Sequence, residues 1–132
     1  MSLTAEEILR SEDIPKPTKV SVPEWGGDDA HVYIKVMGGD DRDSYEASQL
    51  ERVDGKYVFV SHNPTAELLV RTLCDKDGKP LFNRAQVMAL AKKNALVQER
   101  LFDIAADLNR LNKDAVKDTE KNLPAAQSGN SG

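Results

Sequence analysis

The segment SVPEWGGDDAHVYIKVMGGDD, residues 21–41, contains two runs of alternating apolar and polar residues with a glycine pair between them. Apolar side chains at every second position lie on one face of an extended chain, so each run predicts a half-buried strand. The apolar positions are Val22 and the preceding Val20, just outside the segment, in the first run, and Val32, Ile34 and Val36 in the second. Gly26 and Gly27 adopt positive backbone angles without steric cost, which favours a reversal of the chain between the strands.

Trp25, the only tryptophan, directly precedes this glycine pair. A large aromatic ring at the end of a strand can cover the open end of a hairpin while the glycines let the backbone turn beneath it. We therefore predict that Trp25, Gly26 and Gly27 act as a structural anchor, with an exposed partner contact as the alternative role of the ring. Pro23 cannot donate a hydrogen bond to a sheet, which places its strand at an edge.

Helices are predicted on both sides of the hairpin. Thr4 and Glu7 have the spacing of a capping box, which indicates a short opening helix that Pro15 and Pro17 keep from continuing past residue 14. After the second glycine pair, Asp40 is expected to cap a helix over residues 40–50.

The middle of the chain leaves two interpretations open. Residues 51–63 form either a hairpin that turns at Asp54 and Gly55 or a loop with one strand, and we favour the loop or short strand. A helix is predicted from Pro64 to Leu73. Gly78 follows in a predicted tight turn, because an EF-hand alignment of this segment places apolar and basic residues at ligand positions.

The C-terminal third has the most regular pattern. Asn83 and Gln86 predict the start of one helix, and Asn94 predicts the cap of another of about five turns. The apolar positions of this last helix recur at steps of three and four: Val97, Leu101, Ile104, Ala105, Leu108 and Leu111. Such a stripe usually packs into a core, but part of it can be left for a partner. We predict partner contacts at Val97, Leu101, Ile104, Leu108 and Leu111.

These elements predict an α+β fold in which a small N-terminal β-hairpin or sheet packs with a helix-rich C-terminal part. At 132 residues, the chain has the length of one small domain. A weak helix is expected over residues 114–122, and the composition of residues 123–132 is that of a flexible tail. We therefore predict a single domain over residues 1–122.

Composition and charge limit the possible functions. The net charge is −4, with thirteen acids and six bases in residues 1–54 but seven bases and three acids in residues 71–100. Few aromatic residues and an acidic balance argue against nucleic-acid binding, and no apolar run has membrane-spanning length. A single cysteine, Cys74, and the absence of a leader pattern indicate a soluble intracellular protein without a disulfide.

Catalytic patterns are weak. His31 and His62 are far apart in sequence and belong to no catalytic or metal signature, so we predict neither an enzyme nor a cofactor. Aspartates offer one alternative, a metal-dependent enzyme that uses Asp40, Asp41, Asp75 and Asp77. Metal binding by Asp40, Asp41 and Asp43 is a second alternative, although helix capping explains these residues more simply.

Several segments occur in an order that resembles the tail assembly chaperones of long-tailed bacteriophages. These segments are VSVPEWGG, VYIKV, RDSYEAS, LVRTLCDKDGKPLF and RLFDIAADLNRLN, and the resemblance extends to about residue 122. The segment LERVDGKYVFVSHN does not align with the family pattern.

The resemblance implies a chaperone that binds and solubilises the tape measure protein in the host cytoplasm and helps the tail tube protein polymerise around it. It also implies self-association, absence from the finished siphovirus particle and, in many members, a longer product made by ribosomal frameshifting. A minor tail or connector protein that stays in the virion is the nearest alternative. From the opposite charge of the two chain segments, we predict weak, salt-sensitive oligomers with head-to-tail contacts.

Overall fold

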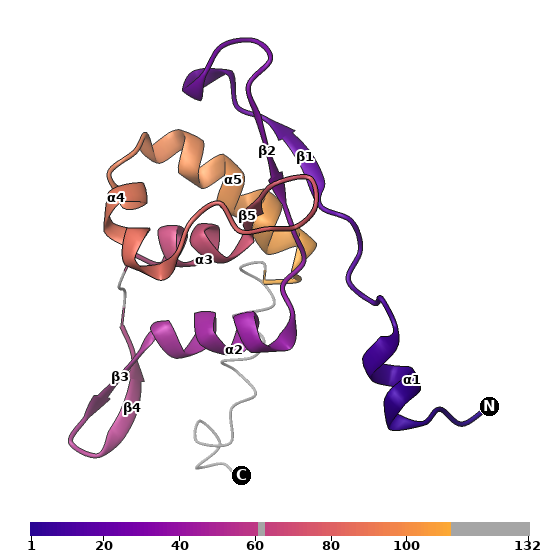
Figure 1. Cartoon of the computed structure of the whole chain (residues 1–132). Coiled ribbons are helices and arrows are strands. Elements are labelled where there is room, and N and C mark those ends of the chain that lie inside the picture. The colour runs from indigo at the N-terminus through magenta and orange to yellow at the C-terminus, as the bar shows by residue number, and fades with distance from the viewer. Residues whose placement is uncertain (61–62, 112–132) are drawn as a thin grey trace.

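The computed structural model describes residues 1–60 and 63–111 (Figure 1). The described residues form a mixed α+β fold, as predicted. In chain order the elements are α1 (Ala5–Arg10), β1 (Thr18–Ser21), η1 (Pro23–Trp25), β2 (His31–Ile34), α2 (Gly39–Ser48), β3 (Leu50–Val53), β4 (Lys56–Phe59), α3 (Pro64–Thr72), β5 (Leu73–Cys74), η2 (Arg84–Gln86), α4 (Val87–Ala91) and α5 (Ala95–Leu108). The helix expected at residues 114–122 and the tail at 123–132 lie outside the described residues.

A three-stranded antiparallel sheet with the order β1-β2-β5 contains the predicted hairpin. Val20 lies opposite Val32 in the hairpin register, and β1 occupies the edge that Pro23 predicted. Pro23 itself begins η1, one residue after Val22. Strand β5 was not expected, because the sequence pattern continued the preceding helix to Leu73. The helix instead ends at Thr72, and Leu73 pairs with Ile34 in the sheet.

The core lies where α3 and α5 pack against each other and against the sheet. Helix α3 also contacts α2 and α4, so it is the central helix of the fold (Figure 1). The fully buried large side chains include Ile34, Leu68, Leu69, Leu73 and Leu101. Burying one such aliphatic side chain stabilises a fold by about 1.5–3 kcal/mol, so this cluster accounts for much of the cohesion between sheet and helices.

The N-cap of helix α2 lies two residues earlier than predicted, and the helix ends at Ser48 rather than at residue 50. Gly38 is the N-cap, and its carbonyl accepts the N–H of Arg42 at 3.0 Å. Asp40 is therefore not the cap: it lies in the first turn, and its carboxylate accepts the N–H of Asp41 at 2.8 Å. Asp40 and Asp41 still favour the helix electrostatically, because carboxylates near a helix N-terminus complement the helix dipole.

Residues 50–59 form a second hairpin, so the preference for a loop in this region was wrong. Strands β3 and β4 pair in antiparallel register and turn at Asp54 and Gly55, whose φ angles are 51° and 79°. Positive φ at both central residues is the geometry of the two-residue turn that Asp-Gly favours. The hairpin projects from the body (Figure 1), and the Tyr57 ring on it is exposed and receives the Arg52 guanidinium 5.8 Å from its centroid.

The caps predicted in the C-terminal third are confirmed. Asn83 and Gln86 form a capping box at η2, which leads directly into α4, and the Asn94 side chain accepts the N–H groups of Leu96 and Val97. Helix α5 has fourteen residues, about four turns rather than the predicted five.

A Schellman motif stops α5 before Leu111. Arg110 takes a left-handed conformation with φ 57°, and the N–H of Leu111 donates to the carbonyl of Ala106. Leu111 therefore lies beyond the helix that was predicted to contain it.

Candidate interaction surfaces

An apolar groove of about 280 Å³ lies beside Trp25. Its lining comes from η1 and from the segment that runs through η2 and α4: Trp25, Phe82, Gln86, Ala89, Leu90 and Lys93. Leu90 is buried, whereas Ala89 and Lys93 are exposed. We call this site the tryptophan groove, an apolar depression with a cationic side chain in its lining.

The turn that carries Trp25 is fixed by its backbone. Val22 donates to the carbonyl of Ala30 at 2.9 Å, and Trp25 donates to the carbonyl of Val22 at 3.0 Å. Gly27 has φ 95°, and a Cβ on Gly26 would lie 3.1 Å from the Ala30 Cβ. Gly27 therefore has the positive φ that the sequence predicted for both glycines, whereas Gly26 has φ −175° and occupies a tight space beside Ala30.

The indole ring packs against the hydrophobic core and is partly buried. Its Nε1 is buried and has no hydrogen-bond partner among the described residues. The position of the ring is consistent with the predicted structural role, and one side of it lines the tryptophan groove. The energetic contribution of Trp25 remains a prediction.

An ion pair connects η1 to α5. The Arg100 guanidinium donates to both carboxylate oxygens of Glu24, at 2.6 and 3.0 Å, and to the carbonyl of Ser21 at 3.2 Å. The hydrogen bonding of the Glu24 carboxylate with Arg100 is the main reason why the pKa of Glu24 is lowered to about 2. Glu24 of the acidic first half and Arg100 of the basic later segment thus pair within one chain, although their opposite charges were predicted to attract different copies.

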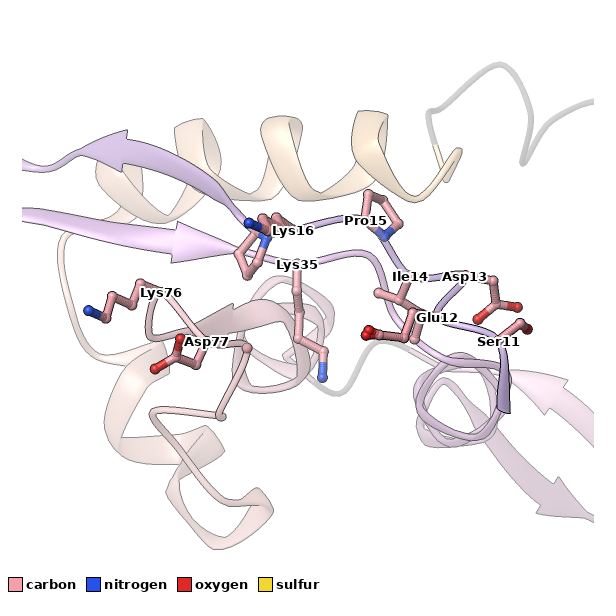
Figure 2. Close-up of a pocket in the computed structure, with 11 residues that line it drawn as sticks. Ser11, Glu12, Asp13, Ile14, Pro15, Lys16, Lys35, Lys76 and Asp77 are labelled. Atoms are coloured by element: carbon pink, nitrogen blue, oxygen red, sulfur yellow. The ribbon is translucent and has the colours of Figure 1, made fainter. Parts of the chain in front are cut away.

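A polar groove of about 760 Å³ separates the N-terminal linker from the sheet (Figure 2). Linker residues 11–17 form one side, Lys76 and Asp77 lie on the other, and the Lys35 side chain points between them (Figure 2). Its lining mixes both charge signs, so the groove offers no cluster of one charge for a highly charged ligand.

The turn after β5 has the tight geometry that the sequence predicted. Gly78 has φ 86°, and the Asp75 carboxylate accepts the N–H groups of Asp77 and Lys79 at 2.8 and 3.0 Å. These hydrogen bonds lower the pKa of Asp75, and the bond from the Lys79 N–H has the largest effect. The carboxylate therefore holds the turn.

The N-terminal segment, residues 1–14, presents apolar side chains outside the body. The capping box of Thr4 and Glu7 is formed as predicted, and α1 ends at Arg10. No residue of α1 is buried, with Ile8 and Leu9 55% and 85% exposed. Figure 1 shows α1 standing apart from the other helices.

The predicted partner stripe on α5 divides into two groups. Val97 and Leu101 are 2% and 0% exposed, so in this conformation they serve the core and are not accessible to a partner. Ile104, Leu108 and Leu111 also pack against the core but are only partly buried. If this stripe contacts a partner, the contact therefore depends on Ile104, Leu108 and Leu111.

The candidate catalytic and metal-binding residues do not converge. His31 contacts the carbonyl of Asp29 through Nδ1 and the edge of the Tyr33 ring, and His62 lies outside the described residues. Within residues 1–60 and 63–111, no three His, Cys, Asp or Glu side chains form a group that could hold a metal. In the same residues, no helix has both the length and the apolar character to cross a membrane.

Sequence reasoning missed most of the tryptophan groove. Phe82 belongs to a segment of the family pattern, and no motif in the sequence marks Ala89 or Lys93 as site residues. The available signal was the apolar pair Leu81-Phe82 in a segment otherwise rich in turn residues. Nothing in that segment alone indicates that it meets Trp25, which lies far away in the sequence.

Two comparisons with known proteins find a similarity, one in fold and one in sequence. A solved structure of the bacteriophage HK97 tail assembly chaperone matches with a TM-score of 0.53 and 20% sequence identity, over 78% of this chain and 90% of that one. A comparison with curated protein sequences finds no significant match. The sequence model of the phage tail assembly chaperone family matches residues 7–122. This match covers most of the chain, which therefore belongs to the phage tail assembly chaperone family.

Proposed function

We propose that this phage tail assembly chaperone binds the tape measure protein, keeps it soluble, and helps the tail tube protein polymerise around it in the host cytoplasm. Family membership supports the general role. The observation that carries the specific proposal is the amount of apolar surface left outside the core. It includes the tryptophan groove, the N-terminal segment and the partly exposed side chains at the end of α5. Apolar surfaces of this kind mark interaction sites, and amphipathic helices bind in apolar grooves.

Coexpression tests this proposal directly. The tape measure protein, produced alone and together with this chaperone, is separated into soluble and insoluble fractions, and the soluble fraction is purified through a tag on the chaperone. We expect the tape measure protein to become soluble and to copurify. A tape measure protein that stays insoluble, or that is soluble but does not copurify, contradicts the proposal.

Contact through the end of α5 is part of the same proposal. Ile104→Gln and Leu108→Gln replace partly buried side chains, whereas Asp107→Gln on the same helix changes an exposed polar one. We expect the first two variants to reduce copurification of the tape measure protein while remaining folded, and the Asp107 variant to retain it. Equal copurification by all three excludes this end of α5 from the contact.

Absence from the finished particle separates this function from that of a virion component. Mass spectrometry of purified particles is expected to detect the tube and tape measure proteins but not this chain. Its presence in amounts comparable to other tail proteins supports the alternative, a minor tail or connector protein. We also propose that the chain forms weak homo-oligomers. We expect sedimentation to show that they dissociate into monomers as salt is added, because salt screens the attraction between oppositely charged surfaces.

A further inference from the structure

The described part of the chain does not bury any side chain of its own N-terminal helix. Helix α1 has six residues and buries none of them. Isolated helices shorter than about 12–15 residues are marginal in water, and a capping box adds only about 1 kcal/mol. Leu3, Ile8 and Leu9 are each more than half exposed. A docked position would bury these side chains and stabilise the helix.

The tryptophan groove has the complementary chemistry. Trp25, Phe82 and Leu90 give it apolar walls, and Lys93 adds a positive charge. The N-terminal segment has aliphatic side chains and four acids, Glu6, Glu7, Glu12 and Asp13, against one base, Arg10. Its apolar residues and its net negative charge therefore match the lining of the groove.

The size of the groove favours a side-chain anchor. At about 280 Å³ it is below the roughly 300–1,000 Å³ of pockets that hold drug-sized ligands. Aliphatic anchors that fill small apolar pockets supply much of the energy of protein interfaces. Ile8 and Leu9 are neighbours at the C-terminal end of α1, so either can serve as such an anchor.

The fold separates the helix from the groove of the same chain. Figure 1 shows α1 and α4 on opposite sides of the body. The linker passes beside Lys35 and the turn at residues 76–78, and Pro15 and Pro17 restrict its backbone (Figure 2). This course directs the N-terminal segment outward, away from α4. A second copy of the chain is therefore the occupant that this geometry favours.

We propose that α1 of one copy docks through Ile8 and Leu9 into the tryptophan groove of the next copy. The inference rests on the proposed self-association and identifies its two surfaces. Each copy keeps one free helix at one end and one free groove at the other, so the contact is heterologous and propagates as an open chain or spiral. Salt dependence follows from the acids of the N-terminal segment and from Lys93.

Variants on each side of the contact test the proposal in the full-length chain. Ile8→Gln/Leu9→Gln removes the anchor side chains, and Arg10→Gln, on the other face of the same exposed helix, is its control. Ala89→Glu places a carboxylate in the groove at an exposed position, and Ala95→Glu is its control outside the groove. Sedimentation at low salt and high protein concentration is expected to show oligomers for wild type and both controls. The helix variant and the groove variant are expected to be monomeric.

Mixing the two defective variants gives the decisive result. The groove variant still has an intact α1, and the helix variant still has an intact groove, so together they form one contact that cannot propagate. We expect each variant alone to be monomeric and an equimolar mixture to form 1:1 heterodimers and nothing larger. A mixture that remains monomeric overturns the proposal, because it would show that an intact α1 and an intact groove on two different copies do not bind each other.

The remaining outcomes separate this inference from the proposals on which it rests. If wild type forms salt-sensitive oligomers and the helix and groove variants do so equally well, self-association stands and the docking proposal fails. If wild type is monomeric under all conditions, the proposed self-association and the proposed docking of α1 both fail. If the groove variant loses copurification of the tape measure protein but keeps its oligomers, the groove belongs to that partner and the docking proposal is overturned.

Discussion

Asn109 accepts a hydrogen bond from the backbone N–H of Met37 at 2.7 Å, although the two residues are 72 positions apart. The Asn109 amide also donates to the carbonyls of Lys35 and Ala105, at 3.2 and 2.9 Å. This side chain therefore joins the end of α5 to the segment that leaves β2. Because Asn109 is also the C-cap residue of α5, one side chain fixes both the end of the helix and its place against the sheet.

Asn109→Ala is expected to lower the free energy of unfolding by about 1–3 kcal/mol, since it leaves the buried Met37 N–H without its acceptor. Denaturant melts measure the change, with the exposed Asp107→Ala on the same helix as the control. A midpoint shift no larger than that of the control would show that the hydrogen bonds of Asn109 contribute little.

Trp25→Ala is expected to destabilise the fold by roughly 3 kcal/mol, the lower end of the range for deleting a buried aromatic side chain, because the ring is partly buried. Trp25→Phe keeps an aromatic ring and removes the buried Nε1, which has no partner among the described residues, so its cost should be much smaller. Denaturant midpoints of the two variants decide the role of the ring. If Trp25→Ala leaves the midpoint unchanged, the structural role fails and the exposed-contact role gains support.

Stability near acidic pH should depend on the ion pair between Glu24 and Arg100. The pKa of Glu24 is lowered from 4.5 to about 2 in the folded chain, chiefly by the hydrogen bond from Arg100. A lowered carboxylate pKa stabilises the fold above the unfolded value, and this contribution is lost as the pH falls from about 4.5 towards 2. The stability difference between wild type and Glu24→Gln should therefore shrink over that range.

Thermal melts at fixed ionic strength measure this dependence. Glu99→Gln removes an exposed carboxylate from α5 and controls for the change in net charge. A difference between wild type and Glu24→Gln that stays constant from pH 6 to pH 2 would mean that the pair does not couple protonation to folding.

Two glycines without close neighbours provide a matched test of backbone conformation. A Cβ added at Gly78 or Gly39 meets nothing within 4 Å, but only Gly78 has a positive φ, 86°. Gly78→Ala is expected to cost about 1–2 kcal/mol from the left-handed conformation alone. Gly39→Ala, at the start of α2, should be neutral or stabilising. Equal effects in denaturant melts would contradict a conformational requirement at the turn after β5.

Local signals in the sequence predicted local structure well. The alternation of Val20 and Val22 with their partners identified the first hairpin, and Asn83 and Asn94 marked the helix starts where the structure has them. These predictions succeeded because strand alternation and capping depend on residues a few positions apart. Asp40 failed as a cap because Gly38 also fits the N-cap position, and the adjacent acids suit the first turn equally well.

Contacts between segments that are far apart in the chain could not be predicted from the sequence. Strand β5 has two residues, and its extended conformation depends on β2, which lies about forty positions earlier. The tryptophan groove likewise forms only when the turn at Trp25 meets Phe82 and α4. The second hairpin was missed for a different reason: the Asp54-Gly55 turn signal was present in the sequence, but the loop was preferred to it.

The final prediction concerns the gene. We expect a longer product made by a backward slip of one nucleotide at codons 120–122, because Glu-Lys-Asn can be encoded as GAA AAA AAC, which contains the slippery run A AAA AAC. The match to the family ends at residue 122, after the described part of α5 and its cap, so a domain added there would leave the core intact. Lys92, Lys93 and Asn94 could be encoded in the same way, but slippage there would replace α5, whose Leu101 and Ala105 are fully buried. The gene sequence shows whether codons 120–122 contain the slippery run. Mass spectrometry of infected cells shows whether a minor product that shares residues 1–122 is made.

Codons without the slippery run, or an overlapping frame that closes at once, would exclude this site. If both requirements are met, synonymous codons at 120–122 should abolish the long product and leave the short one unchanged.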